Sequence, residues 1–517
     1  MSDAARRALG NMLVGSLMTT AAARHPGREA YLCSSTGRRF TFLEANERSN
    51  RLAHALAGLP MRRGSVVAFL CSNRAEIVEI YFAIAKSGLV GLPLNYRLAA
   101  AEIAALTEAM GAEAIICEAR FGSVLEHLRE NAPTLAHYVW IGVEAPAACL
   151  TYETLLARAP AMEPEVEVDE ADPFYFNLTS GTTGLPKSYI VTHYTASNIG
   201  PSMLAFDVRP DDVIMTVFPL FGRVAYSWLS TSIVYGARNV LANFEPEPVL
   251  RLIETESVTI TTLVPTMAAM LLAAPELDSR KLTSLRAVVL AGSMLPPTIR
   301  DATLTRICPR MYEGYGLQES GLLTVSSPED RVLRPDSVGL PVLFTELRIE
   351  DAIGRKLPSG EIGEIVARSP ASATSYFQDP VKSAESFREG WFHTGDLGRL
   401  DDENYLFICG RVKDMIITGG QNVHASEIEA ILMMLPGIIE CAVFGLPNDL
   451  WGEQVTAVIV PADVAHGDPT HVQNLCRDRL SGFKVPRQVF FQPEPLPRTP
   501  TGKVQKFLLV ERYRSAS

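Results

Sequence analysis

The feature that most constrains the fold of this chain is an alternation of short apolar runs with helical patterns between about Thr41 and Gly292. The runs are rich in β-branched residues and carry few polar positions, which is typical of parallel strands buried on both faces. Helices between such strands cover the two faces of the sheet. The strand candidates are 66–71, 114–117, 138–141, 174–178, 213–218, 260–264 and 287–290.

A helix start can be located ahead of the first strand candidate. Thr41 and Glu44 have the spacing of a capping box, in which the threonine hydroxyl accepts from the N–H of Glu44 while the glutamate side chain reaches back. We therefore predict a helix that begins here and runs through Arg51 and Leu56.

The pattern changes after Gly292. Segments 347–349, 364–367 and 405–409 are short and lie among Gly and Pro residues. This texture favours antiparallel strands or a small barrel over more parallel sheet.

A chain of 517 residues is too long for one compact core, so two or more domains are expected. From about Lys413 a further block of about a hundred residues has the size of a small domain. It opens on a turn at Gly419-Gly420 and a helix near 426–435.

Composition limits the classes of function. The net charge of −11 argues against a broad nucleic-acid-binding surface, since such a surface needs clustered Lys and Arg. The eight cysteines form no C-x-x-C pair and have no His at metal-ligand spacing, so we expect reduced thiols. No apolar run approaches the ~20 residues that span a bilayer.

The most informative segment joins a strand to a loop of glycines and hydroxyls that ends on a lysine. Glycines let backbone N–H groups approach a phosphate, hydroxyls donate hydrogen bonds, and an ammonium balances the charge. The loop is not a Walker A motif, because G-x-x-x-x-G-K-[ST] is absent. The phosphate-binding candidates are Thr179, Ser180, Gly181, Thr182, Thr183, Gly184 and Lys187.

The segment Thr179–Lys187 resembles the signature loop of the adenylate-forming superfamily, which comprises acyl-CoA synthetases, firefly luciferase and the adenylation domains of peptide synthetases. Further segments agree in the family's order, so the resemblance covers nearly the whole chain. It implies an α/β fold with a large N-terminal domain, 1–412, of parallel α/β sheets plus a small distorted β-barrel. A small mobile α+β C-terminal domain, 413–517, is expected to follow and to carry a catalytic lysine.

Tyr315-Gly316-Leu317-Gln318-Glu319 resembles the family's Tyr-Gly-x-Thr-Glu segment. The resemblance implies that Tyr315 stacks on adenine and that Glu319 helps to hold Mg²⁺ on the phosphates. These residue types suit the tasks, because an aromatic face fits a purine and a carboxylate oxygen is a hard ligand. Gln318 replaces the usual Thr, which changes the length of the donor.

Three more segments match the family. Asp396, in Thr394-Gly395-Asp396, would accept hydrogen bonds from the ribose hydroxyls. Arg411 would contact the ribose or phosphate region, and Lys413 stands at the hinge position between the domains. The other residues that the resemblance assigns to nucleotide or CoA binding are Gly292, Ser293, Gly314, Gly316, Gly419 and Gly420.

Pro497 to Lys503 resembles the loop that delivers the family's catalytic lysine. Lys503 would bridge the substrate carboxylate and the α-phosphate, where an ammonium can stabilise developing charge. The catalytic residues that the resemblance implies are Thr179, Lys187, Glu319 and Lys503.

The expected acid pocket departs from the family's pattern. Phe221 and Gly222 fall where Phe-His is common, so the glycine leaves space at that wall. Arg223 or Tyr226 would fill the gap, and Arg223 could pair a second carboxylate on the substrate. We expect Arg223 to point to the surface, because buried arginines are uncommon.

The sequence therefore predicts an ATP-dependent acyl-CoA synthetase that uses Mg²⁺ and coenzyme A and acts on a small-molecule carboxylic acid. Because the enzyme would need ATP and CoA, we expect a cytoplasmic location. The oligomeric state, monomer or homodimer, stays open. Three alternatives also stay open: an enzyme that loads a carrier protein instead of CoA, a non-catalytic nucleotide-binding homologue, and a luciferase-like oxygenase. The aliphatic, aromatic or polycyclic nature of the acid is left open as well.

Overall fold

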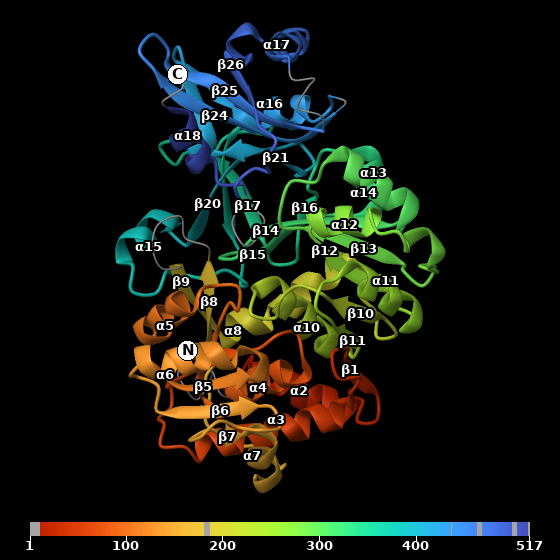
Figure 1. Ribbon diagram of the computed structural model, residues 1–517, viewed down its shortest axis with the longest axis vertical. Coiled ribbons are helices and arrows are strands. Elements are labelled where there is room, and N and C mark those ends of the chain that lie inside the picture. Colours follow the sequence, from red (N-terminus) through yellow and green to blue (C-terminus); the bar gives the residue numbers. More distant parts are fainter. Residues whose placement is uncertain (1–10, 180–186, 436, 463–467, 499–503, 515–517) are drawn as a thin grey trace.

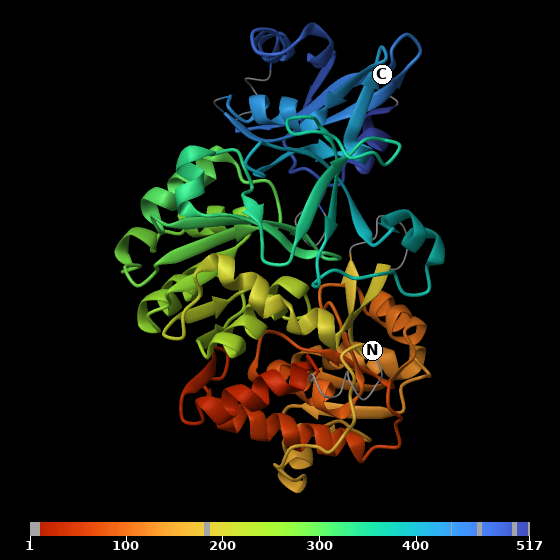
Figure 2. The same cartoon turned by 180° about the vertical axis from the view of Figure 1, so that it is seen from behind.

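The computed structural model describes residues 11–179, 187–435, 437–462, 468–498 and 504–514. Two large α/β sheets form one half of the molecule, a smaller antiparallel sheet follows them, and the C-terminal domain lies at the far end (Figures 1 and 2). No helix among the described residues combines the length and the apolar character that a membrane span requires.

The first large sheet has seven strands in the order β7-β6-β5-β3-β4-β8-β9. All neighbouring pairs are parallel except β8 and β9. Its strands are β3 Val66–Leu70, β4 Val90–Pro93, β5 Ala112–Glu118, β6 His137–Ile141, β7 Leu150–Thr151, β8 Pro173–Thr179 and β9 Lys187–Thr192. The helices of this region are α2 Val14–Arg24, α3 Phe42–Ala57, α4 Ala75–Ser87, α5 Ala100–Ala109, α6 Gly122–Asn131 and α7 Tyr152–Arg158.

The second large sheet has nine strands in the order β16-β15-β14-β13-β12-β10-β11-β1-β2. Its middle is parallel, and the pairs β1–β2, β14–β15 and β15–β16 are antiparallel. Its strands are β1 Glu29–Cys33, β2 Arg39–Thr41, β10 Val213–Thr216, β11 Arg238–Leu241, β12 Ile260–Leu263, β13 Ala287–Ala291, β14 Met311–Leu317, β15 Gly321–Ser326 and β16 Leu340–Pro341. Its helices are α8 His193–Ser197, α9 Ile199–Ser202, α10 Arg223–Tyr235, α11 Pro246–Thr255, α12 Pro265–Leu272, α13 Pro297–Arg306 and α14 Pro328–Leu333.

The parallel-sheet prediction is confirmed, because every strand candidate between residues 66 and 290 lies on a strand of one of these sheets. The capping box is confirmed as well. Thr41 accepts at Oγ1 from the N–H of Glu44 at 3.2 Å, and the N–H of Thr41 donates to the Glu44 carboxylate at 2.8 Å.

One buried core joins the two sheets. Helices α3, α4 and α10 contribute to it, together with Tyr31 of β1 and Tyr175 of β8. Helix α10 therefore begins between the sheets, where the first residues of a helix can reach strand ends from both.

The third sheet is antiparallel and follows the path β17-β18-β20-β19, with β21 paired to β20. It stands where the small distorted barrel is expected, and the predicted antiparallel pairing is confirmed. Its elements are β17 Glu346–Glu350, β18 Gly363–Arg368, α15 Pro380–Ser386, β19 Phe387–Arg388, β20 Trp391–Leu400 and β21 Leu406–Arg411.

The C-terminal part is an α+β unit with its own core, which includes Ile416, Ile428, Val443 and Ile459. The predicted turn at Gly419-Gly420 joins β22 to β23, and the predicted helix is α16. Its elements are β22 Met415–Thr418, β23 Gln421–His424, α16 Ala425–Leu432, β24 Ile438–Asn448, β25 Gly452–Pro461, α17 Pro469–Arg477, β26 Gln488–Phe491 and α18 Lys506–Tyr513. The boundary between residues 412 and 413 stays a prediction.

Buried His193 at the start of α8 predicts acid sensitivity. Its Nδ1 accepts from the N–H of Val14 at 3.3 Å, and burial lowers the pKa of His193 from 6.5 to about 4. Between these two pH values His193 is protonated in the unfolded chain and neutral in the folded chain. The free energy of unfolding is therefore fully retained above pH 6.5 and decreases as the pH falls towards 4. The loss is up to about 3 kcal/mol.

Urea unfolding of the wild type and of His193→Asn across this pH range measures the effect. The variant keeps an acceptor for Val14 but does not titrate, so its free energy of unfolding should fall less steeply with acid. Parallel curves for the two proteins would contradict the assignment.

Candidate functional site

The predicted phosphate loop connects two antiparallel strands. Thr179 at the end of β8 pairs with Lys187 at the start of β9. The loop residues between them, Ser180, Gly181, Thr182, Thr183 and Gly184, lie outside the described residues. Lys503 also lies outside them, and the flanking Arg498 and Val504 form an isolated antiparallel bridge.

Tyr315 and Asp396 meet at the end of β14. The Tyr315 hydroxyl donates to Asp396 Oδ2 at 2.8 Å, and Arg411 Nε lies 2.8 Å from Asp396 Oδ1. Asp396 of β20 and Arg411 of β21 are direct neighbours in the sheet register, which explains their ion pair. Burial and the Asp396 carboxylate raise the pKa of Tyr315 well above its usual value, so its hydroxyl remains a donor. The structure thus brings together three residues that the sequence places up to 96 positions apart, by the numbering.

Glu319 lies in the short turn between β14 and β15. Tyr376 donates its hydroxyl to Glu319 Oε1 at 2.9 Å, and the Lys187 ammonium lies 5.0 Å from the centre of the Tyr376 ring. Burial and Glu319 raise the pKa of Tyr376, which keeps the phenol protonated. Tyr376 therefore lies between the predicted phosphate-binding lysine and the predicted metal-binding carboxylate.

Gln318 is oriented by a buried amide. Asn177 of β8 donates from Nδ2 to Gln318 Oε1 at 3.0 Å and also to the Tyr189 hydroxyl at 2.5 Å. Asn177 is 1% exposed although it stands within an apolar strand. A polar residue in the middle of an apolar strand is the sequence signal that indicates this orienting role of Asn177. Tyr376 lies in a short irregular segment, where no periodic pattern distinguishes it.

The segment before α10 carries the expected acid pocket. Phe221 packs edge-on against Tyr96 with ring centres 5.2 Å apart. A Cβ at Gly222 would meet nothing closer than the Pro219 carbonyl oxygen at 3.4 Å, so the glycine does leave space. Buried Asn73 fixes the segment, because its side chain donates to Phe218 O at 2.7 Å and accepts from Leu220 N at 2.8 Å. The lining of the acid pocket by these residues stays a prediction.

The expectation that Arg223 points to the surface is wrong. Arg223 is 2% exposed and Tyr226 is fully buried. Tyr226 packs against Tyr81 and Tyr175 with ring centres 5.0 and 5.3 Å away. Both side chains are buried because α10 begins between the two large sheets, so other elements surround the first turn of this helix.

The small residues of the site have distinct geometric reasons. A Cβ at Gly316 would lie 2.0 Å from the Gly321 carbonyl oxygen, so β14 and β15 can approach closely only with glycine there. Gly419 and Gly420 have φ of 57° and 75°, as a two-residue hairpin turn of the I′ kind requires. Gly292, at the end of β13, has φ of 93° and is followed by Ser293, while Gly314 lies in β14.

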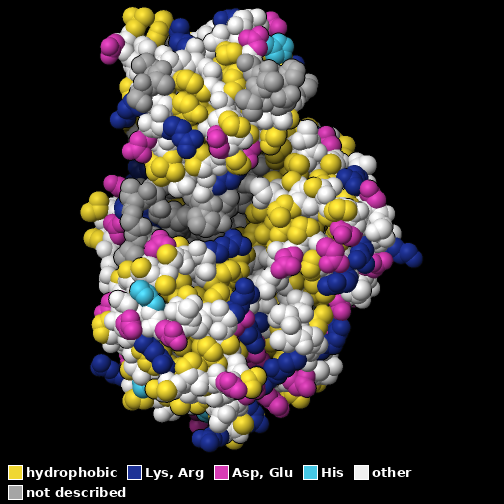
Figure 3. All heavy atoms as spheres, viewed as in Figure 1, with side chains coloured by type: hydrophobic (Ala, Val, Ile, Leu, Met, Phe, Trp, Pro, Cys, Tyr) yellow, Lys and Arg dark blue, Asp and Glu magenta, His cyan; other side chains and the backbone are white. Residues whose placement is uncertain are grey.

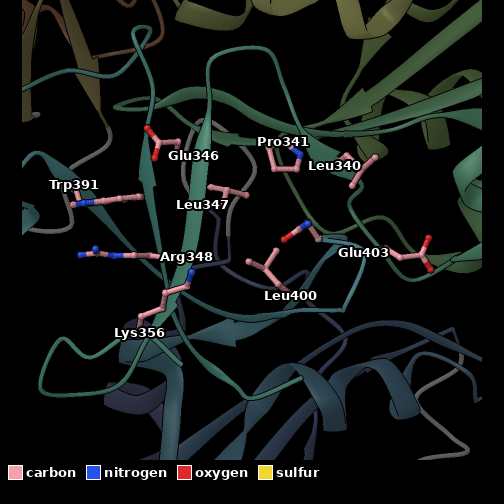
Figure 4. A pocket seen from close by; sticks show the side chains of 10 residues that line it. Leu340, Pro341, Glu346, Leu347, Arg348, Lys356, Trp391, Leu400 and Glu403 are labelled. Carbon is pink, nitrogen blue, oxygen red and sulfur yellow. The ribbon is translucent and has the colours of Figure 1, made fainter. Parts of the chain in front are cut away.

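The face of the molecule is hollowed between the C-terminal domain and the large sheets (Figure 3). An open cavity of about 610 Å³ lies elsewhere, on the third sheet, where Trp391, Arg348 and Leu347 contribute to its wall (Figure 4). None of the predicted site residues that the structure describes lines this cavity. Its lining residues are Leu340, Pro341, Glu346, Leu347, Arg348, Lys356, Trp391, Leu400, Glu403 and Asn404.

Comparison with known proteins gives a consistent result. Residues 18–377 match the family model described as AMP-binding enzyme, and residues 427–503 match the AMP-binding enzyme C-terminal domain. A long-chain-fatty-acid–CoA ligase of Mycobacterium tuberculosis is 33% identical, with 97% of this chain and 98% of that protein covered. A feruloyl-CoA synthase of an Amycolatopsis species is 34% identical, with 92% and 94% covered. The ATP-bound structure of MatB from Rhodopseudomonas palustris superposes with a TM-score of 0.89 at 26% identity, over 98% and 99% of the two chains.

The Tyr315–Asp396 hydrogen bond should be measurable as a coupling energy. Tyr315→Phe and Asp396→Asn, made singly and together, should give a coupling of about 1–2 kcal/mol in urea unfolding, because the bond is buried and one partner is charged. As a control, Tyr315→Phe combined with Asp330→Asn should be additive, since Asp330 bonds to Tyr405 instead. Additivity of the first pair would contradict the contact.

Proposed function

This chain belongs to the AMP-binding enzyme family and is an AMP-forming acid–CoA ligase, and we propose how its residues share the work of making an acyl-CoA by way of an acyl-adenylate. One observation carries the proposal. The β14–β15 hairpin holds Tyr315 against the Asp396–Arg411 pair and Glu319 against Tyr376, which contacts Lys187. Tyr315, the proposed nucleoside-binding residue, and Glu319, the proposed magnesium ligand, thus lie at the two ends of one five-residue segment, residues 315–319.

In the first step the substrate carboxylate attacks the α-phosphorus of ATP, the bond to the bridging oxygen breaks, and pyrophosphate leaves with that electron pair. Lys187 and the hydroxyls and N–H groups of the loop that it closes would hold the phosphates. Lys503 would offset the charge that develops between the carboxylate and the α-phosphate. No covalent bond to the protein is required, because the chain contributes positioning and charge.

The residues at Glu319 fit a magnesium ion that is shared with the nucleotide. The described residues contain no group of three or more His, Cys, Asp or Glu side chains able to hold a metal alone. Mg²⁺ is ordinarily bound by one or two carboxylates together with phosphates and water, which is what Glu319 beside a phosphate loop offers. When bound, the ion would neutralise charge on the phosphates.

In the second step the thiol of CoA attacks the acyl carbonyl, and AMP leaves with the electron pair of the broken mixed-anhydride bond. Lys413 lies in a short 3₁₀ turn, Val412–Asp414, between β21 and β22. Rotation about this turn would withdraw Lys503 and bring the Gly419-Gly420 turn towards the site, where its lack of side chains suits a narrow pantetheine passage.

We infer that the acid has one carboxylate and an apolar tail. Arg223 is the one cation of the predicted pocket set, and its guanidinium faces carbonyl oxygens of the protein. Phe221 of this segment packs against the aromatic ring of Tyr96. The names of the fatty-acid and feruloyl relatives describe acids of this kind. Because ATP and CoA are its substrates, we place the enzyme in the cytoplasm.

Release of AMP from ATP and Mg²⁺, measured with a panel of carboxylic acids with and without CoA, tests this function. Apolar monocarboxylic acids should give AMP that depends on both acid and CoA, and dicarboxylic acids should give much less. AMP formation indifferent to CoA would favour a carrier-protein loader. ATP binding without any acid-dependent AMP would favour a non-catalytic homologue.

Lys503→Ala should separate the two half-reactions. Adenylate formation should fall by about 100-fold or more, the size of effect seen when one charge-stabilising donor is removed. Thioester formation from a supplied acyl-adenylate should be retained. Lys506→Ala, which removes a lysine bound to Glu429 at 2.7 Å, is the neighbouring control and should spare both half-reactions. Equal losses of both in Lys503→Ala would contradict its role.

A further inference from the structure

The Arg223 guanidinium is buried without a carboxylate partner among the described ion pairs. It donates from Nη1 to Gln318 O at 2.6 Å and to Glu319 O at 3.1 Å, from Nη2 to Ala371 O, and from Nη1 to the Tyr189 hydroxyl at 3.3 Å. A buried guanidinium is costly unless its donors are satisfied. The acceptors engage Nη1 and Nη2 and so fix the position of the group, while Nε is buried without a hydrogen-bond partner among the described residues. All but Tyr189 are main-chain carbonyls, which fix backbone position.

The backbone contacts of Arg223 connect Glu319 to the segment that begins at Ala371. Arg223 holds the Glu319 carbonyl and the Ala371 carbonyl, and the N–H of Ala373 donates to the same Glu319 carbonyl at 2.8 Å. The segment that Arg223 holds at Ala371 continues to Tyr376, whose hydroxyl donates to the Glu319 carboxylate. One side chain therefore links the main chain of Glu319 to the segment that orients its carboxylate.

The local sequence makes room for this arrangement. Gly321, which follows the turn, has φ of 70°, and a Cβ there would lie 3.2 Å from Arg223 Nη2. Gly222, which precedes Arg223, has an extended backbone as the N-cap of α10 and starts the helix between the sheets. Burial works against the charge of Arg223, yet Tyr189, Tyr175 and Glu319 raise its pKa, so the group stays cationic beside the turn.

We propose that Arg223 is a positioning residue of the adenylation step: by fixing the main chain of Gln318 and Glu319, it sets the direction in which the Glu319 carboxylate meets the metal–nucleotide complex. The proposal rests on the proposed function. Loss of Arg223 should therefore weaken the binding of ATP with Mg²⁺ but not the binding of ATP alone. The Tyr315–Asp396–Arg411 group, which is proposed to hold the nucleoside, makes none of the contacts of Arg223.

The test is binding of a non-hydrolysable ATP analogue by calorimetry, with and without Mg²⁺, to the wild type, Arg223→Lys and Arg48→Lys. A lysine cannot span the same carbonyls in one fork. The enhancement of ATP affinity by Mg²⁺ should shrink about 10- to 100-fold in Arg223→Lys, because a displacement of about 1 Å in a positioned group can have an effect of about this size. Binding without Mg²⁺ should be unchanged. Arg48→Lys is the matched control, since Arg48 is largely buried and bidentate on Glu79 in another part of the domain.

A second variant keeps the test decisive if Arg223→Lys does not fold. Tyr376→Phe removes only the hydroxyl that donates to the Glu319 carboxylate, and it should also reduce the enhancement of ATP affinity by Mg²⁺. Wild-type enhancement in a folded Arg223→Lys, or equal loss in Arg223→Lys and Arg48→Lys, would overturn the proposal. If Arg223→Lys is unfolded, wild-type enhancement in Tyr376→Phe would overturn it. A wild type that binds no ATP would overturn the proposed function and this inference with it.

Discussion

The close approach of β14 and β15 at Gly316 is the constraint on which the candidate site depends. A register shift between Tyr315 and Gly316 accompanies it, and such bulges re-aim the side chains next to them. Within five residues the hairpin directs an aromatic ring towards Asp396 and a carboxylate towards Tyr376. A side chain at Gly316 would push the strands apart and separate these two groups.

Other polar groups of the protein hold the polar groups around the hairpin. Asp396 is 5% exposed and engages Tyr315 and Arg411, while Arg223 holds the turn from the side of α10. In a low-dielectric setting such contacts are strong when complete and costly when broken. This fixed arrangement suits a reaction whose catalysis consists of orienting charged phosphates and a carboxylate, because little reorganisation is needed when the charges move.

The secondary structure could be predicted because its signals are local. Apolar runs, the Thr41–Glu44 capping box and the Gly419-Gly420 turn each depend on a few neighbouring residues, and all three are confirmed. The site was predictable only as a set of segments that resemble a family. Contacts that join those segments, such as Tyr376 with Glu319 across 57 positions, leave no local trace in the sequence. The same reason explains the wrong expectation for Arg223, since its burial depends on two sheets that meet around α10.

The most direct test of the account is to follow the carboxylate oxygen. With an accepted acid labelled with ¹⁸O in its carboxylate, and with ATP, Mg²⁺ and CoA, an acyl-adenylate intermediate requires that each AMP formed carries one ¹⁸O atom. That atom was the nucleophile at the α-phosphorus and stays with the phosphate when the thiol displaces AMP. Label in pyrophosphate, or unlabelled AMP beside a labelled thioester, would contradict an acyl-adenylate and with it the roles assigned to Glu319, Tyr376 and Arg223.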